Sequence, residues 1–254
     1  MSILALDSVS KSFGGVRAAD GVSFEVREGE FLALIGPNGA GKSTCFNLIN
    51  GQLRPDSGEI RFVNRNIAGL PPRAIWRLGV GRTFQIAATF GSMTVAENVQ
   101  MALITHANEV FGFWRPAAAR HRAQALGLLA SVGMREAADR PCRELAYGDV
   151  KRVELAIALA NEPRLLLMDE PTAGMAPRER NELIALVKRL VLERRISVLF
   201  TEHSMDVVFT YADRIVVMAR GRLIADRDPK SIRDDPHVQE VYFGTGKTFE
   251  NVPA

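Results

Sequence analysis

A glycine-rich segment at residues 36–43 has the residue types and the spacing of a phosphate-binding loop. It fits the pattern G-x-x-x-x-G-K-[ST] directly after a continuous apolar run at 31–35. In such a loop the glycines let backbone N–H groups turn toward phosphate oxygens, the lysine reaches the β and γ phosphates, and the hydroxyl ligates Mg²⁺. We therefore expect ATP and Mg²⁺ to bind here, with Lys42 on the phosphates and Ser43 on the metal. The residues expected at ATP are Gly36, Pro37, Asn38, Gly39, Ala40, Gly41, Lys42, Ser43 and Thr44.

Two neighbouring carboxylates, Asp169 and Glu170, follow a second short apolar run at 165–168. A carboxylate at the end of a strand beside a phosphate loop is placed to hold Mg²⁺, usually through water, and the next carboxylate can polarise the water that attacks the γ-phosphate. On its own, such a pair is as typical of a helix cap. Together with the phosphate loop it predicts hydrolysis, with Asp169 at the metal and Glu170 at the water.

Gln85 and His203 gain meaning only from their order along the chain. His203 follows a strand expected at 196–200 and so lies at the edge of the sheet where ligands bind in open α/β folds. A lone histidine is otherwise more often a core or surface group, and a glutamine after Phe84 is more often an ordinary loop residue. We interpret both as candidate site residues.

Hydrophobic patterns predict the elements that must position these residues. Val22, Phe24 and Val26 alternate with polar residues, as in a half-buried strand. Apolar residues repeat at helical spacing between 183 and 191. Strands that alternate with helices predict an α/β fold with a largely parallel sheet and helices on both of its faces. The continuous runs expected to be fully buried strands lie at 31–35, 165–168, 196–200 and 215–218.

The middle of the chain changes character. From about 94 to 162 it is rich in Ala and Leu and lacks strand-like runs, which predicts a helical subdomain inserted into the sheet core. We expect a single domain with its core at about 1–93 and 163–226. The chain becomes polar after Arg227, so residues 227–254 are expected to form a surface tail.

The composition is that of an ordinary globular chain, with 47% apolar and 24% charged residues. The net charge of +3 comes from scattered basic residues, which argues against a nucleic-acid partner. Cys45 and Cys142 lack metal-ligand spacing and are expected to be reduced structural thiols. We find neither a signal peptide nor an apolar run of the roughly 18–20 residues that span a bilayer. Any link to a membrane is therefore expected to pass through partners.

The motifs, in their order along the chain, resemble those of ABC-transporter ATPases from Phe13 to Gly221. The resemblance implies a P-loop NTPase core with an inserted helical subdomain, and two such subunits that pair head to tail around ATP. It also implies that Phe13 stacks on adenine, that Gln85 contacts Mg²⁺ and senses the membrane partner, and that His203 contacts the γ-phosphate. Phe13 could equally be an ordinary core residue. The family's signature, which meets the opposing subunit's ATP, corresponds to Leu145, Ala146, Tyr147, Gly148 and Asp149.

Two departures from the family pattern lie in this signature and in a later loop. The signature is usually Leu-Ser-Gly-Gly-Gln, so Ala146 lacks a hydroxyl, and Tyr147 and Asp149 also differ. Gly148 and a helix expected over 150–160 still provide N–H donors and a helix dipole. Ala176 occupies a loop position where the family often has aspartate. We hypothesise that the two composite ATP sites of the assembled transporter are unequal; the alternative is that both changes are simply tolerated.

Several segments resemble the ATP-binding subunits of branched-chain amino acid importers, the LivG-like branch. This implies a bacterial importer, with the chain peripheral at the cytoplasmic face of the inner membrane. The implied partners are a second ATPase subunit, identical or different, two membrane permeases and, indirectly, an external solute-binding protein. Relatives of the branch also serve amides and urea. The segments that carry the resemblance lie at 34–39, 81–85, 93–99, 201–206 and 235–244.

Two rival classes share part of this motif set. One is a lipid-export ATPase of the lipopolysaccharide type, against which the segment 83–85 and a long insert near 111–115 argue. The other is a soluble ABC protein of translation or DNA repair, which usually has two cassettes or a long coiled coil; this chain has one cassette and no sustained heptads. Aromatic residues at 110–116 either pack inside the helical insert or form an exposed docking patch.

Overall fold

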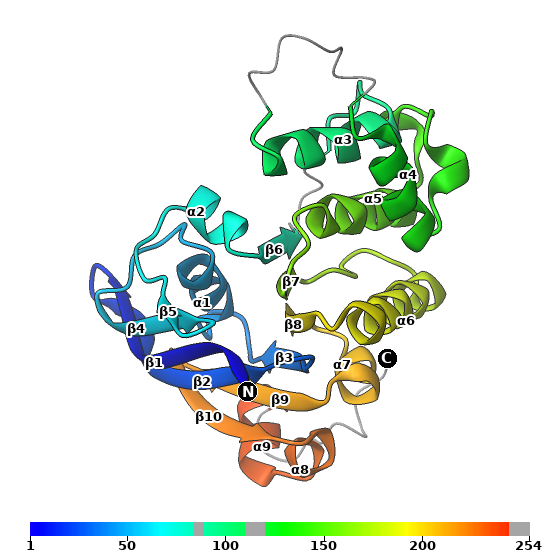
Figure 1. Cartoon of the computed structure of the whole chain (residues 1–254). Coiled ribbons are helices and arrows are strands. Elements are labelled where there is room, and N and C mark those ends of the chain that lie inside the picture. The colour runs from blue at the N-terminus through cyan, green and yellow to red at the C-terminus, as the bar shows by residue number, and fades with distance from the viewer. Residues whose placement is uncertain (84–88, 110–119, 244–254) are drawn as a thin grey trace.

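The computed structural model describes residues 1–83, 89–109 and 120–243 and contains two sheets (Figure 1). The larger sheet has the strand order β10-β9-β3-β8-β7-β6 and is parallel except for the antiparallel pair β9–β10. This confirms the predicted, largely parallel α/β core. Its strands are β3 (Phe31–Ile35), β6 (Val80–Thr83), β7 (Leu165–Asp169), β8 (Ser197–Thr201), β9 (Arg214–Ala219) and β10 (Arg222–Arg227).

A second, antiparallel sheet was not predicted from the sequence. It has the order β2-β1-β4-β5 and, together with residues of α1 (Lys42–Ile49) and α2 (Pro72–Arg77), covers one face of the larger sheet, where we had expected helices. Local alternation indicated the strand at Val22–Val26, but the partners of that strand are set by tertiary pairing. The strands of this sheet are β1 (Ser2–Phe13), β2 (Val16–Arg27), β4 (Ser57–Phe62) and β5 (Arg65–Asn66).

The central strands are buried on both faces because successive side chains point to opposite sides. In β3, Phe31, Ala33 and Ile35 enter the core shared with the helices of the larger sheet, whereas Leu32 and Leu34 enter the core shared with β1, β2 and β4. All five side chains are fully buried. The two cores therefore fix β3, and with it the start of the loop that follows Ile35.

The helices fall into groups around this sheet (Figure 1). Three of them, α3, α4 and α5, pack together above the sheet, and α3 begins with a capping box in which Thr94 and Glu97 bond each other's backbone N–H. The described residues between 94 and 162 contain helices and turns; that this segment is a subdomain of its own remains a prediction. The helices are α1 (Lys42–Ile49), α2 (Pro72–Arg77), α3 (Val95–His106), α4 (Arg122–Ser131), α5 (Tyr147–Leu159), α6 (Pro177–Arg194), α7 (Met205–Tyr211), α8 (Pro229–Arg233) and α9 (Pro236–Phe243).

The segment after residue 227 differs from the predicted polar surface tail. Residues up to 243 form α8 and α9, and the side chains of Ile232 and Val238 are fully buried in the core beside β9. Asp228 caps α8 through a hydrogen bond from the Ser231 N–H. The polar residues that suggested a tail are the exposed faces and caps of two short amphipathic helices.

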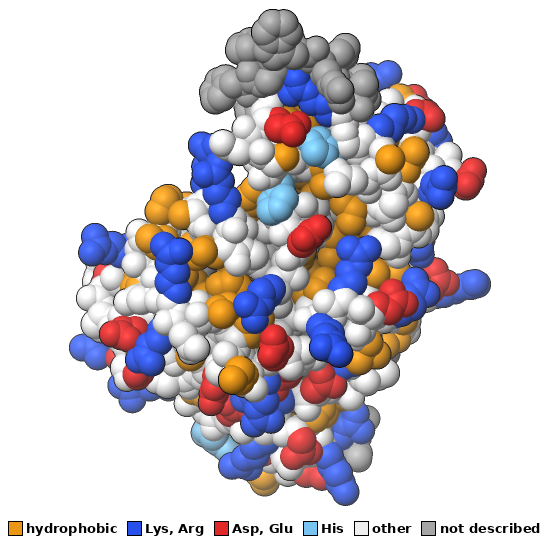
Figure 2. All heavy atoms as spheres, viewed as in Figure 1, with side chains coloured by type: hydrophobic (Ala, Val, Ile, Leu, Met, Phe, Trp, Pro, Cys, Tyr) orange, Lys and Arg blue, Asp and Glu red, His pale blue; other side chains and the backbone are white. Residues whose placement is uncertain are grey.

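Both cysteines are free and buried, as expected for structural thiols. Burial raises the pKa of Cys45 to about 12. In the part of the chain described, none of the helices combines the length and the apolar character needed to cross a membrane. Charges of both signs are interspersed over the face shown in Figure 2, without a large basic field there. The aromatic segment 110–116 lies outside the described residues, so its two interpretations stay open.

Candidate functional site

The phosphate loop joins the end of β3 to the start of α1, and two of its glycines are required by close backbone contacts. Gly36 has φ +155°, and a Cβ atom there would lie 2.2 Å from the carbonyl oxygen of Met218. Gly41 has φ +104°, and its Cβ would lie 2.1 Å from the carbonyl oxygen of Ala18. Any larger residue at either position would push the loop away from β2 or β9. The loop is therefore held by its neighbours in the shape that its glycines allow.

Lys42 lies inside this loop. Its Nζ donates hydrogen bonds to the carbonyl oxygens of Gly36 at 2.7 Å and Pro37 at 3.2 Å, and the side chain is buried. Burial lowers the pKa of Lys42, whereas the charges of Glu170 and Asp169 act in the opposite direction. The ammonium is thus held by the loop carbonyls and lies within electrostatic range of the two carboxylates.

The next residues stand at the start of α1. Ser43 is exposed in the first turn, with its hydroxyl accessible to a ligand, and Thr44 is half-buried. Asn38 and Gly39 are exposed at the tip of the loop, so their backbone N–H groups are open to a ligand as well. A helix N-terminus with exposed residues beside it favours an anion.

Three supports of the loop come from residues that sequence reasoning did not select. The Gly221 N–H, in the turn between β9 and β10, donates to the Ala40 carbonyl at 3.0 Å, and the Asp20 N–H donates to the Gly221 carbonyl at 2.8 Å. From α9, the phenol oxygen of Tyr242 accepts a hydrogen bond from the backbone of Gly36, and burial raises the pKa of Tyr242. None of these residues belongs to the phosphate-loop motif itself, since each is remote from it in sequence.

Asp169 stands at the end of β7, where the parallel register places it opposite Thr201 of β8. The Thr201 hydroxyl donates to Oδ1 of Asp169 at 2.8 Å, and the guanidinium of Arg82 lies 3.5 Å from Oδ2. Arg82 also donates to Asn47 on α1. Burial lowers the pKa of Arg82, and the Asp169 charge opposes that shift. The carboxylate is thus oriented from two sides; the sequence signal that could have found Thr201 is its position two residues before His203.

Glu170 and His203 form a hydrogen-bonded pair. Nε2 of His203 lies 2.7 Å from Oε1 of Glu170, although the two residues are far apart in the sequence. Glu170 adopts φ +49°, and its N–H donates to the carbonyl oxygen and the hydroxyl of Thr201 at 3.2 and 3.0 Å. The left-handed backbone turns the side chain out of the strand direction toward His203. A carboxylate held by a half-exposed imidazole at the mouth of a phosphate loop can orient and polarise a water.

The signature residues lie elsewhere, on the helical group (Figure 1). Helix α5 begins at Tyr147, three residues before the start we predicted, with Ala146 as an N-cap that has no side-chain cap bond. Gly148 and Asp149 therefore occupy the first helical turn, and the helix N-terminus is formed by the signature itself. Tyr147 is 45% exposed, and Leu145 packs against the core.

Of the two remaining candidates, Phe13 and Gln85, only Phe13 lies within the described residues. Phe13 ends β1, opposite Val16 of β2, and is 47% exposed, so it is not an ordinary core residue. Its exposure leaves the ring available for stacking. Gln85 lies outside the described residues, and its role at Mg²⁺ stays a prediction.

Comparison with known proteins gives matches along nearly the whole chain. A family model described as ABC transporter matches residues 19–173. The high-affinity branched-chain amino acid transport ATP-binding protein BraF of Pseudomonas aeruginosa is 40% identical over 249 residues, which cover 95% of this chain and 98% of that protein. LivG of Escherichia coli K12, which carries the same description, is 37% identical over 251 residues, again 95% and 98% of the two chains. The crystal structure of the ADP conformation of MJ1267, an ATP-binding cassette of an ABC transporter, superposes with a TM-score of 0.87 at 36% identity and covers 96% of this chain and 99% of that one.

Proposed function

The chain belongs to the ABC transporter family, and we propose that it is the ATP-binding and ATP-hydrolysing subunit of an importer for branched-chain or related hydrophobic amino acids. The observation that carries the catalytic part is the meeting of Lys42, Asp169 and Glu170 at one edge of the larger sheet, with His203 on Glu170. The names of the relatives carry the solute class. Uptake of amides or urea is the alternative within the same family.

Some of the site residues bind ATP, and others act in its hydrolysis. The backbone of the phosphate loop and Lys42 hold the β and γ phosphates, and Phe13 stacks on the adenine. Ser43, Asp169 and Gln85 would hold Mg²⁺, which, when bound, neutralises charge on the phosphates. Glu170 orients and polarises the attacking water, and His203 holds Glu170 and reaches the γ-phosphate.

A single chain provides half of each composite site. We infer that two ATPase subunits, identical or different, pair head to tail, so that the signature at 145–149 of one meets ATP on the phosphate loop of the other. Binding of ATP closes the pair, and hydrolysis at Glu170 releases it. The pair would couple this cycle to two membrane permeases, supplied by an external solute-binding protein, with the chain peripheral at the cytoplasmic face of the inner membrane.

The unusual signature and loop give a more specific hypothesis, that the two composite sites are unequal. Ala146 and Ala176 are the N-cap residues of α5 and α6, and neither side chain caps its helix. A serine or an aspartate at these positions adds an oxygen that the present residues lack. The alternative is that both substitutions are tolerated without effect. We would measure transporter ATPase after Ala146→Ser and Ala176→Asp singly; an unchanged rate in both variants would remove the hypothesis.

Substitution of Glu170 tests the catalytic assignment. We expect Glu170→Gln to retain ATP binding, because Lys42 and the phosphate loop are untouched, while hydrolysis falls by about 100-fold or more through loss of the polarising carboxylate. Nucleotide binding and steady-state phosphate release measure the two effects separately. Glu193→Gln, an exposed carboxylate in the last turn of α6, is a control change. Turnover of Glu170→Gln equal to that of the unchanged chain would reject Glu170 as the residue that activates water.

The solute class is tested in the assembled transporter. The chain, expressed with its cognate permeases and binding protein, is expected to support ATP-dependent uptake of labelled leucine, isoleucine or valine. Uptake of amides or urea instead would keep the ATPase assignment and replace the solute. Co-purification with RNA or ribosomes, and not with permeases, would contradict the transport role.

A further inference from the structure

A buried glutamate next to His203 joins the two loops that carry the hydrolytic pair. Oε1 of Glu202 accepts two hydrogen bonds from Thr172, one from its backbone N–H at 3.0 Å and one from its hydroxyl at 2.7 Å. The same carboxylate accepts a hydrogen bond from the backbone of His203. Thr172 follows Glu170 by two residues, so one side chain connects the loop after Glu170 to the segment that carries His203.

The described hydrogen bonds of Glu202 are with the two loops that carry the hydrolytic pair. The residue is 5% exposed, and burial raises its pKa, while the hydrogen bonds from Thr172 and His203 and the charge of Arg180 oppose that shift. A carboxylate so deeply buried is costly unless donors surround it. Here the donors that surround it are backbone and hydroxyl groups of the two loops, so its burial fixes these loops relative to each other.

A second connection joins the same two segments. Arg180, on the first turns of α6, donates to the hydroxyl of Ser204 at 2.6 Å and to the carbonyl of Met175 at 3.5 Å. Residues 172–176, which we call the linking loop, are therefore held to residues 202–204 near both of their ends. These contacts hold the linking loop and the His203 segment in a fixed relative position.

The other side of the linking loop lies against the signature of the same chain. A Cβ atom at Gly174 would lie 3.9 Å from the ring of Tyr147, and one at Gly148 would lie 3.5 Å from the methyl group of Met175. The linking loop thus stands between the signature and the Glu170–His203 pair. A displacement of the signature would reach the pair through packed atoms.

We propose that Glu202 is a positioning residue for hydrolysis, which ties the linking loop to His203 and so transmits the position of this chain's signature to its own Glu170–His203 pair. The inference rests on the proposed function, in which the signature meets ATP held by the opposing subunit. The hydrogen bonds of Glu202 are to Thr172 and His203 and not to the phosphate loop. Loss of the Glu202 carboxylate is therefore expected to lower turnover without weakening ATP binding. A misplacement of about 1 Å in such a pair can slow the reaction about 100-fold.

The test is a double-mutant cycle on the full chain, assayed as the assembled transporter. Glu202→Ala is expected to lower kcat about tenfold, with KM for ATP within about twofold. Thr172→Val removes the hydroxyl bond alone and is expected to lower kcat about threefold. The double variant is expected to be no slower than Glu202→Ala, since both changes break one connection. Glu202→Gln keeps an acceptor oxygen and should retain kcat within about threefold of the unchanged chain.

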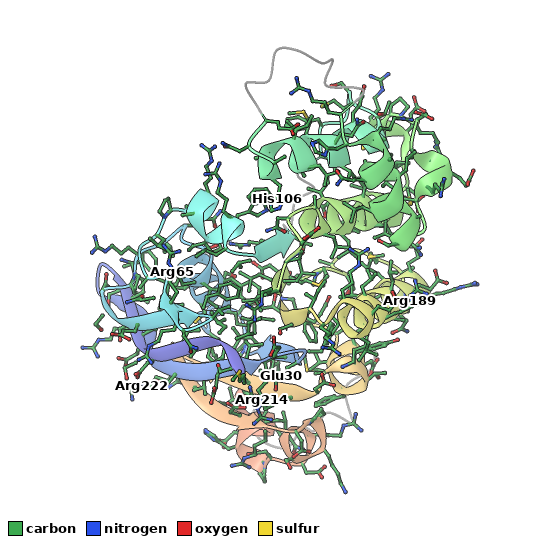
Figure 3. The ribbon with its side chains drawn as sticks, in the orientation of Figure 1. Glu30, Arg65, His106, Arg189, Arg214 and Arg222 are labelled. Atoms are coloured by element: carbon green, nitrogen blue, oxygen red, sulfur yellow. The ribbon has the colours of Figure 1, made fainter. Side chains whose placement is uncertain are left out.

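Glu30→Ala is the matched control. Glu30 is 7% exposed and pairs with Arg214 at 2.8 Å (Figure 3). It lies just before the start of β3, whereas the phosphate loop follows the other end of that strand. Glu30→Ala is expected to lower the unfolding temperature without the loss of kcat. The inference is overturned if kcat of Glu202→Ala stays within twofold, if Glu30→Ala loses as much turnover, or if the losses of the cycle multiply. An unchanged chain that hydrolyses no ATP would instead overturn the proposed function, so the two failures are distinguishable.

Discussion

At the scale of single residues, the shape of the phosphate loop depends on positions where no side chain fits. Gly41 illustrates this, because its left-handed backbone and the Ala18 carbonyl both exclude a side chain. Gly39, in the same loop, also has positive φ, at +79°, but no atom lies within 4 Å of where its Cβ would be. At both positions the backbone conformation favours glycine. At Gly41 the contact with Ala18 excludes a side chain as well.

The pair predicts different costs for the same substitution. Gly41→Ala is expected to lower the free energy of unfolding by about 3 kcal/mol, through overpacking against Ala18 and backbone strain together. Gly39→Ala has the strain alone and is expected to lose about 1 kcal/mol. Denaturant unfolding of the two variants, with equal slopes, measures the difference. Equal losses would show that the contact with Ala18 relaxes freely and does not hold the loop.

At the scale of elements, the site is assembled from the ends of strands and the beginnings of helices. The parallel register of β7 and β8 brings Asp169 beside Thr201. Glu170 follows Asp169 directly and His203 follows Thr201 by two residues, so the pair forms just beyond the two strand ends. Helices α5 and α6 begin close together, at the signature and at the end of the linking loop. Each has an alanine as its N-cap residue, at a position where the family often has an oxygen-bearing side chain.

Because neither helix has a side-chain cap, substitution of its N-cap alanine by a capping residue is expected to stabilise the fold. Ala146→Ser gives α5 an oxygen that can accept an N–H from its first turn, and is expected to raise the free energy of unfolding by about 1 kcal/mol. Chemical denaturation of the isolated chain measures this effect apart from any contact with ATP. Ala107→Ser, at the C-terminal end of α3, is the control, because a hydroxyl there caps no N–H group. Loss of stability in Ala146→Ser would contradict the N-cap geometry.

At the scale of the whole molecule, the C-terminal segment returns to the site. Helices α8 and α9 pack beside β9 through Ile232 and Val238, and α9 brings Tyr242 to Gly36 at the start of the phosphate loop. Residues from the first and last parts of the chain thus meet at one loop. Polar sequence and proximity to the terminus had suggested a surface tail, and burial of one side of each helix decided otherwise.

This contact predicts a role for the C-terminal helix in nucleotide affinity. Tyr242→Phe keeps the packing but leaves the Gly36 backbone without its partner on α9, so ATP is expected to bind about fivefold more weakly, equivalent to about 1 kcal/mol. Titration calorimetry in the Glu170→Gln background measures binding without turnover. Tyr211→Phe is the control, because the Tyr211 hydroxyl makes only a 3.5 Å contact with the Asn181 carbonyl. Equal affinity in Tyr242→Phe and the unchanged chain would remove this role.

The sequence by itself determined the phosphate loop, the carboxylates Asp169 and Glu170, the buried strands and the family. These features are local: a loop that binds phosphate through its own backbone needs its glycines and Lys42 at fixed spacing, and a strand buried on both faces needs a continuous apolar run. The second sheet, the helices after residue 227 and the partners of the site residues were decided only by the tertiary structure. Thr201 on Asp169, Glu202 on Thr172 and Tyr242 on Gly36 join positions far apart in the chain. Strand order and packing set such contacts, and neither leaves a spacing that a single sequence can show.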